Sequence, residues 1–133
     1  MTDNPGAHRA LGNAGEDFAA LLLESKGHEI LCRNYSAKGG EIDIISKLGE
    51  YIVFTEVKLR RGNYSPMAAV THAKIGRVIS CAERYLSEKG FDMVNSPPKV
   101  RIDIIALKYD GEEFALVNHI EGLNLVRARA RKR

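Results

Sequence analysis

Hydrophobic residues along this chain of 133 residues recur with two alternating periods, one typical of helices and one typical of strands. Between about Arg9 and Lys26 they lie three, four and seven residues apart, which predicts an amphipathic helix that ends at Gly27. A second helical pattern follows Thr71, a candidate N-cap. The expected core faces consist of Leu11, Ala14, Phe18, Leu21 and Leu22 in the first helix and of Ile75, Val78, Ile79, Ala82 and Leu86 in the second.

Five runs rich in β-branched and aromatic residues predict strands, at about 28–35, 41–46, 51–58, 100–108 and 113–120. The first three runs follow one another closely, which favours an antiparallel meander. The second helix then crosses to the remaining strands. The order α-β-β-β-α-β-β therefore predicts an α/β fold, in which helices flank a mixed β-sheet.

The length of the chain predicts a single domain over residues 1–126, followed by a basic tail, residues 127–133, that is too charged to pack. Without the five basic residues of this tail, 15 basic residues face 17 acidic ones, so the body carries a net charge of −2. Any contact with nucleic acid is then expected from local patches, the tail or a bound metal.

The chain has no apolar run long enough to cross a bilayer, and its first residues lack the apolar core of a signal peptide. We therefore expect a cytoplasmic protein without a membrane partner. Cys32 and Cys81 fall in a predicted strand and a predicted helix, so we expect both to be reduced and structural.

The predicted hairpin at 40–58 carries charged residues where an ordinary hairpin has none. Glu41 and Asp43 are two residues apart on one strand, and Glu56 and Lys58 are two apart on the next, so each pair shares a face of the sheet. Charges amid such β-prone residues are costly unless they are paired or coordinated.

Two interpretations of these charges remain open from the residues alone. Two carboxylates about 4 Å apart repel by about 4 kcal/mol at an effective dielectric constant of 20, and a cation between them relieves that repulsion. Oxygen ligands without His or Cys favour Mg²⁺ or Mn²⁺, held by Asp43 and Glu56, with Lys58 beside a phosphodiester under attack by water. The alternative is a structural ion pair that joins Lys58 to Glu56 or to Asp43.

The helices add further charged candidates. Glu16 lies off the densest apolar stripe of the first helix, and spacing alone favours a solvated charge. On the second helix Lys74, Arg77 and Arg84 follow one face together with Cys81. Basic residues on one face of a helix are usually exposed to solvent, and the alternative is that they contact phosphates.

Several motifs resemble those of the YraN family of uncharacterised bacterial proteins. They are GNAGED at 12–17, RNY at 33–35, GEIDII at 40–45, VFTEVKLR at 53–60, the lysine-bearing helix around Lys74, the aspartate strand at Asp103, and HIEGLN at 119–124. That family is similar to nucleases of the restriction-endonuclease-like superfamily, among which archaeal Holliday-junction resolvases are its nearest functional relatives.

The resemblance implies a restriction-endonuclease-like fold and a catalytic set of Asp43, Glu56 and Lys58. Resolvase-like members have a further acidic site residue on the first helix, and the matching residue here is Glu16. This differs from the spacing of Glu16, which favours a solvated charge. It also implies a phosphate contact for Lys74 and a supporting role for Glu41. Resolvases cut paired strands, which suggests a homodimer.

These observations lead us to expect a Mg²⁺- or Mn²⁺-dependent endonuclease acting on DNA, including branched or otherwise structured DNA. The metal ligands would be Asp43, Glu56 and Glu16. The DNA backbone would be bound without sequence readout by Arg60, Arg61, Lys74, Arg77 and Arg84. The alternative is a module that binds nucleic acid without catalysis and keeps the nuclease fold.

Overall fold

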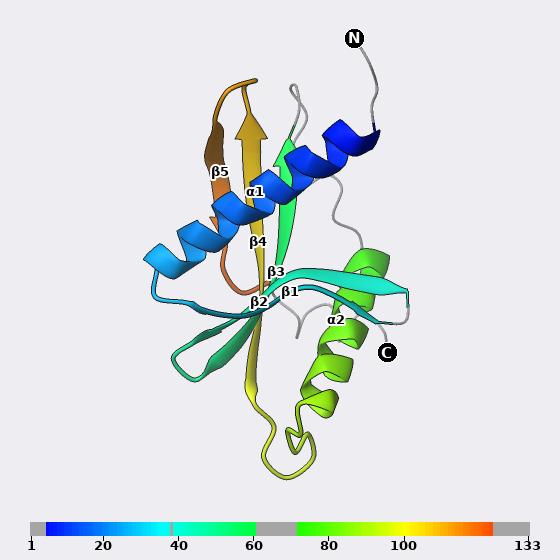
Figure 1. Cartoon of the computed structure of the whole chain (residues 1–133). Helices are drawn as coiled ribbons and strands as arrows, with labels where there is room; N and C mark the ends of the chain where they lie inside the picture. The colour runs from blue at the N-terminus through cyan, green and yellow to red at the C-terminus, as the bar shows by residue number, and fades with distance from the viewer. Residues whose placement is uncertain (1–4, 38, 61–71, 124–133) are drawn as a thin grey trace.

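The computed structural model describes residues 5–37, 39–60 and 72–123 of the chain (Figure 1). Arg61, Thr71 and the basic tail lie outside the described residues. The elements are α1 (Pro5–Ser25), β1 (Glu29–Ala37), β2 (Gly40–Leu48), β3 (Tyr51–Arg60), α2 (His72–Glu88), β4 (Lys99–Tyr109) and β5 (Phe114–Ile120). This is the predicted order, and each predicted element lies within a few residues of its observed bounds.

The five strands form one mixed sheet in the order β1-β2-β3-β4-β5. β1, β2 and β3 pair antiparallel, which confirms the predicted meander. α2 then carries the chain across so that β4 lies parallel to β3, and β5 returns antiparallel to β4. The sheet is therefore mixed, as the sequence predicts.

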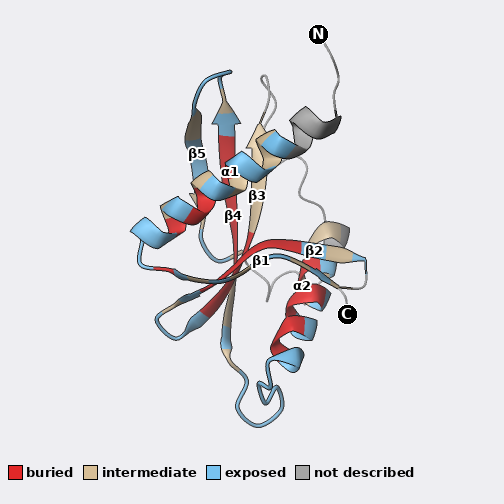
Figure 2. Ribbon diagram, in the orientation of Figure 1, coloured by how far each residue is buried: buried red, intermediate tan, exposed pale blue. Residues whose placement is uncertain are grey.

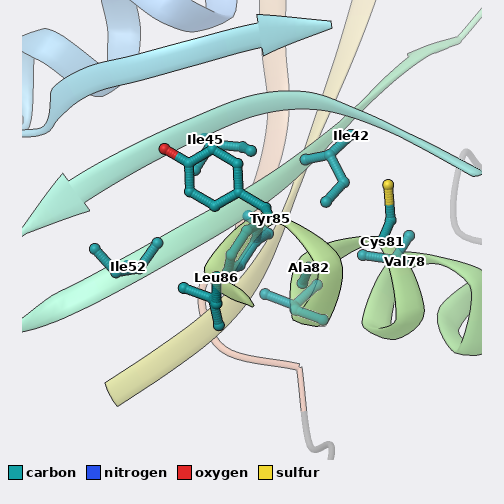
Figure 3. Close-up of a cluster of buried hydrophobic side chains, with 10 residues drawn as sticks. Ile42, Ile45, Ile52, Val78, Cys81, Ala82, Tyr85 and Leu86 are labelled. Carbon is teal, nitrogen blue, oxygen red and sulfur yellow. The ribbon is translucent and has the colours of Figure 1, made fainter. Parts of the chain in front are cut away.

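The two helices cover opposite faces of the sheet, and each builds its own core (Figure 1). Alternation along a strand sends neighbouring side chains to opposite faces, so residues of one strand serve both cores. α1 packs Ala19, Ala20 and Leu23 against Ile44, Ile105 and Leu107. The cluster under α2 is drawn in Figure 3, where Val78, Cys81, Ala82, Tyr85 and Leu86 face the isoleucines of β2 and β3, Ile42, Ile45 and Ile52.

The predicted core faces of the helices are only partly correct. Leu21 is 67% exposed, whereas Leu23 is fully buried, so the stripe of α1 that faces the sheet is rotated from the predicted one. Figure 2 shows buried and exposed positions following one another along α1. On α2, Cys81 is 2% exposed and packs in the core instead of standing in a solvated basic row, and Tyr85 joins it there. Both cysteines are free, as predicted.

A buried polar cluster around Asp103 joins β4 to β5 and to the residues that follow α1 and β5. Asp103, with no exposed surface, accepts two hydrogen bonds from Arg101, at 2.9 and 2.8 Å, and one from the backbone N–H of Gly122 at 3.0 Å. His119 Nε2 lies 2.8 Å from the same carboxylate, and His119 Nδ1 lies 2.7 Å from the Lys26 amine. Because an ammonium can only donate, His119 must accept from Lys26 at Nδ1 and donate to Asp103 at Nε2.

This cluster shows how the buried Asp103 is tolerated. Burial raises the pKa of Asp103, but hydrogen bonds from His119, Arg101 and Gly122 together outweigh burial and leave the pKa below its usual value. The carboxylate thus stays charged and holds the end of α1 near β4 and β5. No helix in the described part of the chain is long and apolar enough to cross a membrane.

Candidate active site

The candidate site lies where β2 and β3 cease to pair. Their paired residues run from Leu48 opposite Tyr51 to Ile44 opposite Thr55. Asp43 and Glu56 come next on the two strands, just beyond the last pair. The Asp43 carboxylate accepts a hydrogen bond of 2.7 Å from the backbone N–H of Val57. A side chain thereby satisfies a backbone group where the strands separate.

Glu56 and Lys58 lie two residues apart on β3 and so on the same face of the sheet. Their side chains are 19% and 15% exposed, and Lys58 Nζ lies 3.6 Å from Glu56 Oε1. Together with Lys74 of α2 they line a pocket whose other walls are apolar. Its volume of about 20 Å³ is enough for about one water molecule or ion. A larger ligand would therefore have to lie outside the pocket, against the polar groups.

Glu16 reaches the same region from α1. Its side chain is 15% exposed. Burial raises the pKa of Glu16, the positive charge of Arg33 opposes that rise, and the charge of Glu41 adds to it. Its Oε1 is buried without a hydrogen-bond partner among the described residues, and the nearest cation, Arg33 Nη2, is 3.8 Å away. Glu16 is therefore not the solvated helix charge that its spacing favours.

Asp43 carries the strongest electrostatic perturbation of the site. Burial and the neighbouring Glu56 carboxylate raise the pKa of Asp43 from 3.8 to about 8, and Glu16 contributes in the same direction. The hydrogen bond from Val57 opposes the rise without cancelling it. Three acidic groups of two strands and one helix therefore lie close enough for their negative charges to disfavour one another.

Lys58 also influences Lys74 of α2. The hydrogen bond with Lys58 lowers the pKa of Lys74, and burial and the repulsion by Lys58 lower it further. Lys74 thus belongs to the site through its contact with Lys58. The ion pair between Glu56 and Lys58 matches one form of the structural alternative, but Asp43 still lies beside two other carboxyl groups.

The acid cluster fits a divalent cation, because a cation would relieve the repulsion that raises the pKa of Asp43. Across the described ranges, no three His, Cys, Asp or Glu side chains are arranged so that they could hold a metal ion. Mg²⁺ commonly uses only one or two protein carboxylates and takes its remaining ligands from water and phosphate. Asp43 and Glu56 match that requirement, and Glu16 would then act through water or after a small movement.

The other predicted residues lie around this site in different ways. Glu41 is exposed and close enough to influence Glu16. Arg60 is half-buried at the end of β3, and its Nε has no hydrogen-bond partner within the described residues. Arg77 is exposed on α2, whereas Arg84 pairs with Glu88 at 3.2 Å. The structure therefore does not give one continuous basic row on α2.

Arg33 and Asn34 have no predicted role in the site, although both belong to the RNY motif at 33–35. Arg33 Nη1 lies 2.7 Å from Asp17 on α1, and the Asn34 side chain hydrogen-bonds Glu16. The signal that could have found them is the helix–strand charge complementarity between acidic Glu16-Asp17 and Arg33.

The fold and the site together define a class: an α/β protein with a mixed sheet and an acid–lysine cluster where two central strands separate. The chain belongs to the uncharacterised protein family UPF0102, whose model matches residues 15–107. This confirms the resemblance to the YraN family.

Curated UPF0102 proteins are similar to the chain over most of its length. One from Streptomyces griseus is 39% identical over 121 residues, which cover 89% of this chain and 98% of that protein. One from Thermotoga neapolitana is 38% identical and covers 83% and 94% of the two chains. One from Rhodococcus jostii is 42% identical and covers 84% and 92%. The matched span contains Glu16, Asp43, Glu56 and Lys58.

Proposed function

We propose that this protein is a metal-dependent endonuclease that hydrolyses phosphodiester bonds in DNA, including branched or otherwise structured DNA. The observation that carries the proposal is the buried carboxyl of Asp43, which lies where β2 and β3 separate and close to Glu56 and Glu16, so that burial and these acids raise its pKa to about 8. Strongly perturbed acids beside a lysine and a pocket are typical of catalytic sites.

Each residue of the site has a role in this proposal. Asp43 and Glu56 would hold Mg²⁺ or Mn²⁺, and Glu16 would complete the acid cluster directly or through water. A bound ion would neutralise the carboxylates and stabilise the charge that develops on the phosphate. Lys58, 3.6 Å from Glu56, would orient the attacking water or bind a phosphate oxygen.

The binding of DNA would depend on cations near the site. Lys74 adjoins Lys58, Arg77 is exposed one helical turn farther along α2, and Arg60 ends β3. These groups would contact the phosphate backbone and would not read the base sequence. We also propose that Arg61 and Arg84 take part, Arg84 after exchanging Glu88 for phosphate. Glu41 would have a supporting role on the substrate side of the site.

The proposal is tested by incubating the purified protein with Mg²⁺ or Mn²⁺ and with linear, flapped and four-way DNA. We expect metal-dependent cleavage that is lost in Asp43→Asn and Lys58→Ala. Glu24→Gln on α1 and Lys47→Ala on β2 change exposed charges away from the site and serve as matched controls. Cleavage that persists in both site variants would show that the site is wrong.

Binding of the same DNA without any cleavage would favour the alternative function, a non-catalytic nucleic-acid-binding module. We also propose that the protein forms a homodimer, which light scattering on the protein alone and with four-way DNA tests. We propose a cytoplasmic location as well, which fractionation of the source cells tests.

A further inference from the structure

The backbone of β1 changes direction opposite the candidate site. Arg33 pairs with Ile44 and Tyr35 pairs with Ile42, so Asn34 lies across from Asp43. Within the described residues Asn34 is the one non-glycine residue with positive φ, at 53°. Asn is among the few residues that adopt this left-handed conformation at low cost, and unusual conformations of this kind concentrate at functional sites.

This conformation lets two consecutive side chains contact the same helix. In a regular strand, neighbouring side chains point to opposite faces of the sheet. Here Arg33 lies 2.7 Å from Asp17 and 3.8 Å from Glu16, and the side chain of Asn34 hydrogen-bonds Glu16 as well. Both neighbours in β1 therefore meet one turn of α1.

Glu16 needs such contacts in order to face the site. Glutamate has several rotatable bonds, and a side chain that must act at one point loses rotamer freedom. Arg33 is anchored by Asp17 and keeps a positive charge near Glu16 without a close contact, while one oxygen of Glu16 has no hydrogen-bond partner among the described residues. That oxygen remains available to a cation, to water or to substrate.

We propose that Asn34 and Arg33 are positioning residues that hold Glu16 toward Asp43 and Glu56, with the left-handed backbone of Asn34 placing both side chains on α1. This inference rests on the proposed function for its catalytic consequence, but its first consequence is the affinity for a metal ion. Residues that orient metal ligands typically change metal affinity or activity by about 10- to 100-fold when they are replaced.

The test separates the amide of Asn34 from its backbone conformation. Asn34→Gly keeps a backbone that favours positive φ and removes only the amide. Ser36→Gly, at an exposed position of the same strand, is the matched control. Mn²⁺ affinity is measured by calorimetry on the metal-free protein, next to the melting temperature and to kcat and KM on DNA.

We expect Asn34→Gly to weaken Mn²⁺ binding by about 10-fold or more, with a melting temperature close to that of the parent. Ser36→Gly should not weaken it. In a Glu16→Gln background Asn34→Gly should have no further effect, because Asn34 acts through Glu16. A purely structural role for Asn34 would not produce this dependence on Glu16.

Unchanged Mn²⁺ affinity in Asn34→Gly would overturn the inference, as would equal losses with and without Glu16→Gln, or a parent protein that binds no Mn²⁺. A parent that binds Mn²⁺ and cleaves no DNA would refute the proposed function alone. The affinity series would then still decide the role of Asn34.

Discussion

Replacement of Asp43 by Asn should stabilise the metal-free protein, although Asp43 is buried and hydrogen-bonded. Asn has nearly the same shape, and its side-chain oxygen can still accept the hydrogen bond from Val57. What the change removes is a negative charge that is 8% exposed and lies beside Glu56 and Glu16. The free energy of unfolding should therefore rise by the cost of the repulsion and desolvation that this charge imposes on the folded state.

The size and the pH dependence of this gain follow from the pKa of Asp43. Because the folded pKa is about 8 and the ordinary value is 3.8, the folded state binds the proton more tightly, so wild-type stability falls as the pH rises from about 4 to about 8. At about 1.4 kcal/mol per pH unit, the ceiling is about 6 kcal/mol. Reorientation of Glu56 relieves part of the repulsion, so we expect Asp43→Asn to gain about 3 kcal/mol at pH 8 and almost nothing at pH 4.

The assay is urea unfolding of both proteins between pH 4 and pH 9, in the presence of a chelator, with the free energy of unfolding extrapolated to water. Glu24→Gln, which removes an exposed carboxyl group of α1, is the control. Its difference from the parent in the free energy of unfolding should not change with pH. An Asp43→Asn protein that is less stable than the parent at pH 8 would refute the reasoning. It would mean that the charged Asp43 carboxylate stabilises the fold by accepting the hydrogen bond from Val57.

Further predictions concern the two helices and the buried carboxylate of β4. Asp103→Asn should lower the free energy of unfolding by about 3 to 5 kcal/mol in urea, since it breaks a buried pair with Arg101, and a loss below 1 kcal/mol would contradict the role of the cluster. The wild-type contribution of Asp103 is present above the unfolded pKa, near 3.9, and is lost as the pH falls through the lower folded value, so acid should remove the difference. Leu23→Ala should cost about 2 to 5 kcal/mol, whereas Leu21→Ala, at a 67% exposed position, should stay within about 0.5 kcal/mol. Equal losses at Leu21 and Leu23 would contradict the observed orientation of α1.

The order of elements could be predicted because the strands are short β-prone runs separated by glycine turns. The residue that follows α1, Gly27, adopts φ of 94°, as expected of a helix stop. The choice of core face was harder for α1, because apolar residues surround much of the helix and both Leu21 and Leu23 fit a helical spacing. Only the position of the sheet decides which of them is buried.

Some residues of the candidate site could likewise be recognised from the local sequence, whereas others depend on tertiary packing. Asp43, Glu56 and Lys58 could be singled out as candidates from the sequence, because charges inside β-prone runs stand out locally. Glu16 could not be found by spacing, since its burial depends on how α1 crosses the sheet. The role of Asn34 was hidden as well, because a single left-handed residue in a strand changes which side chains share a face and leaves no periodic signal.

The central claim, that Asp43 and Glu56 form a divalent-metal site, is tested most directly by anomalous diffraction from crystals soaked in Mn²⁺. We expect one strong peak in contact with carboxylate oxygens of both residues, with Glu16 turned toward it, and no peak in Asp43→Asn crystals. Crystals of the parent protein with no Mn²⁺ peak at this position, and with Lys58 still paired to Glu56, would contradict it.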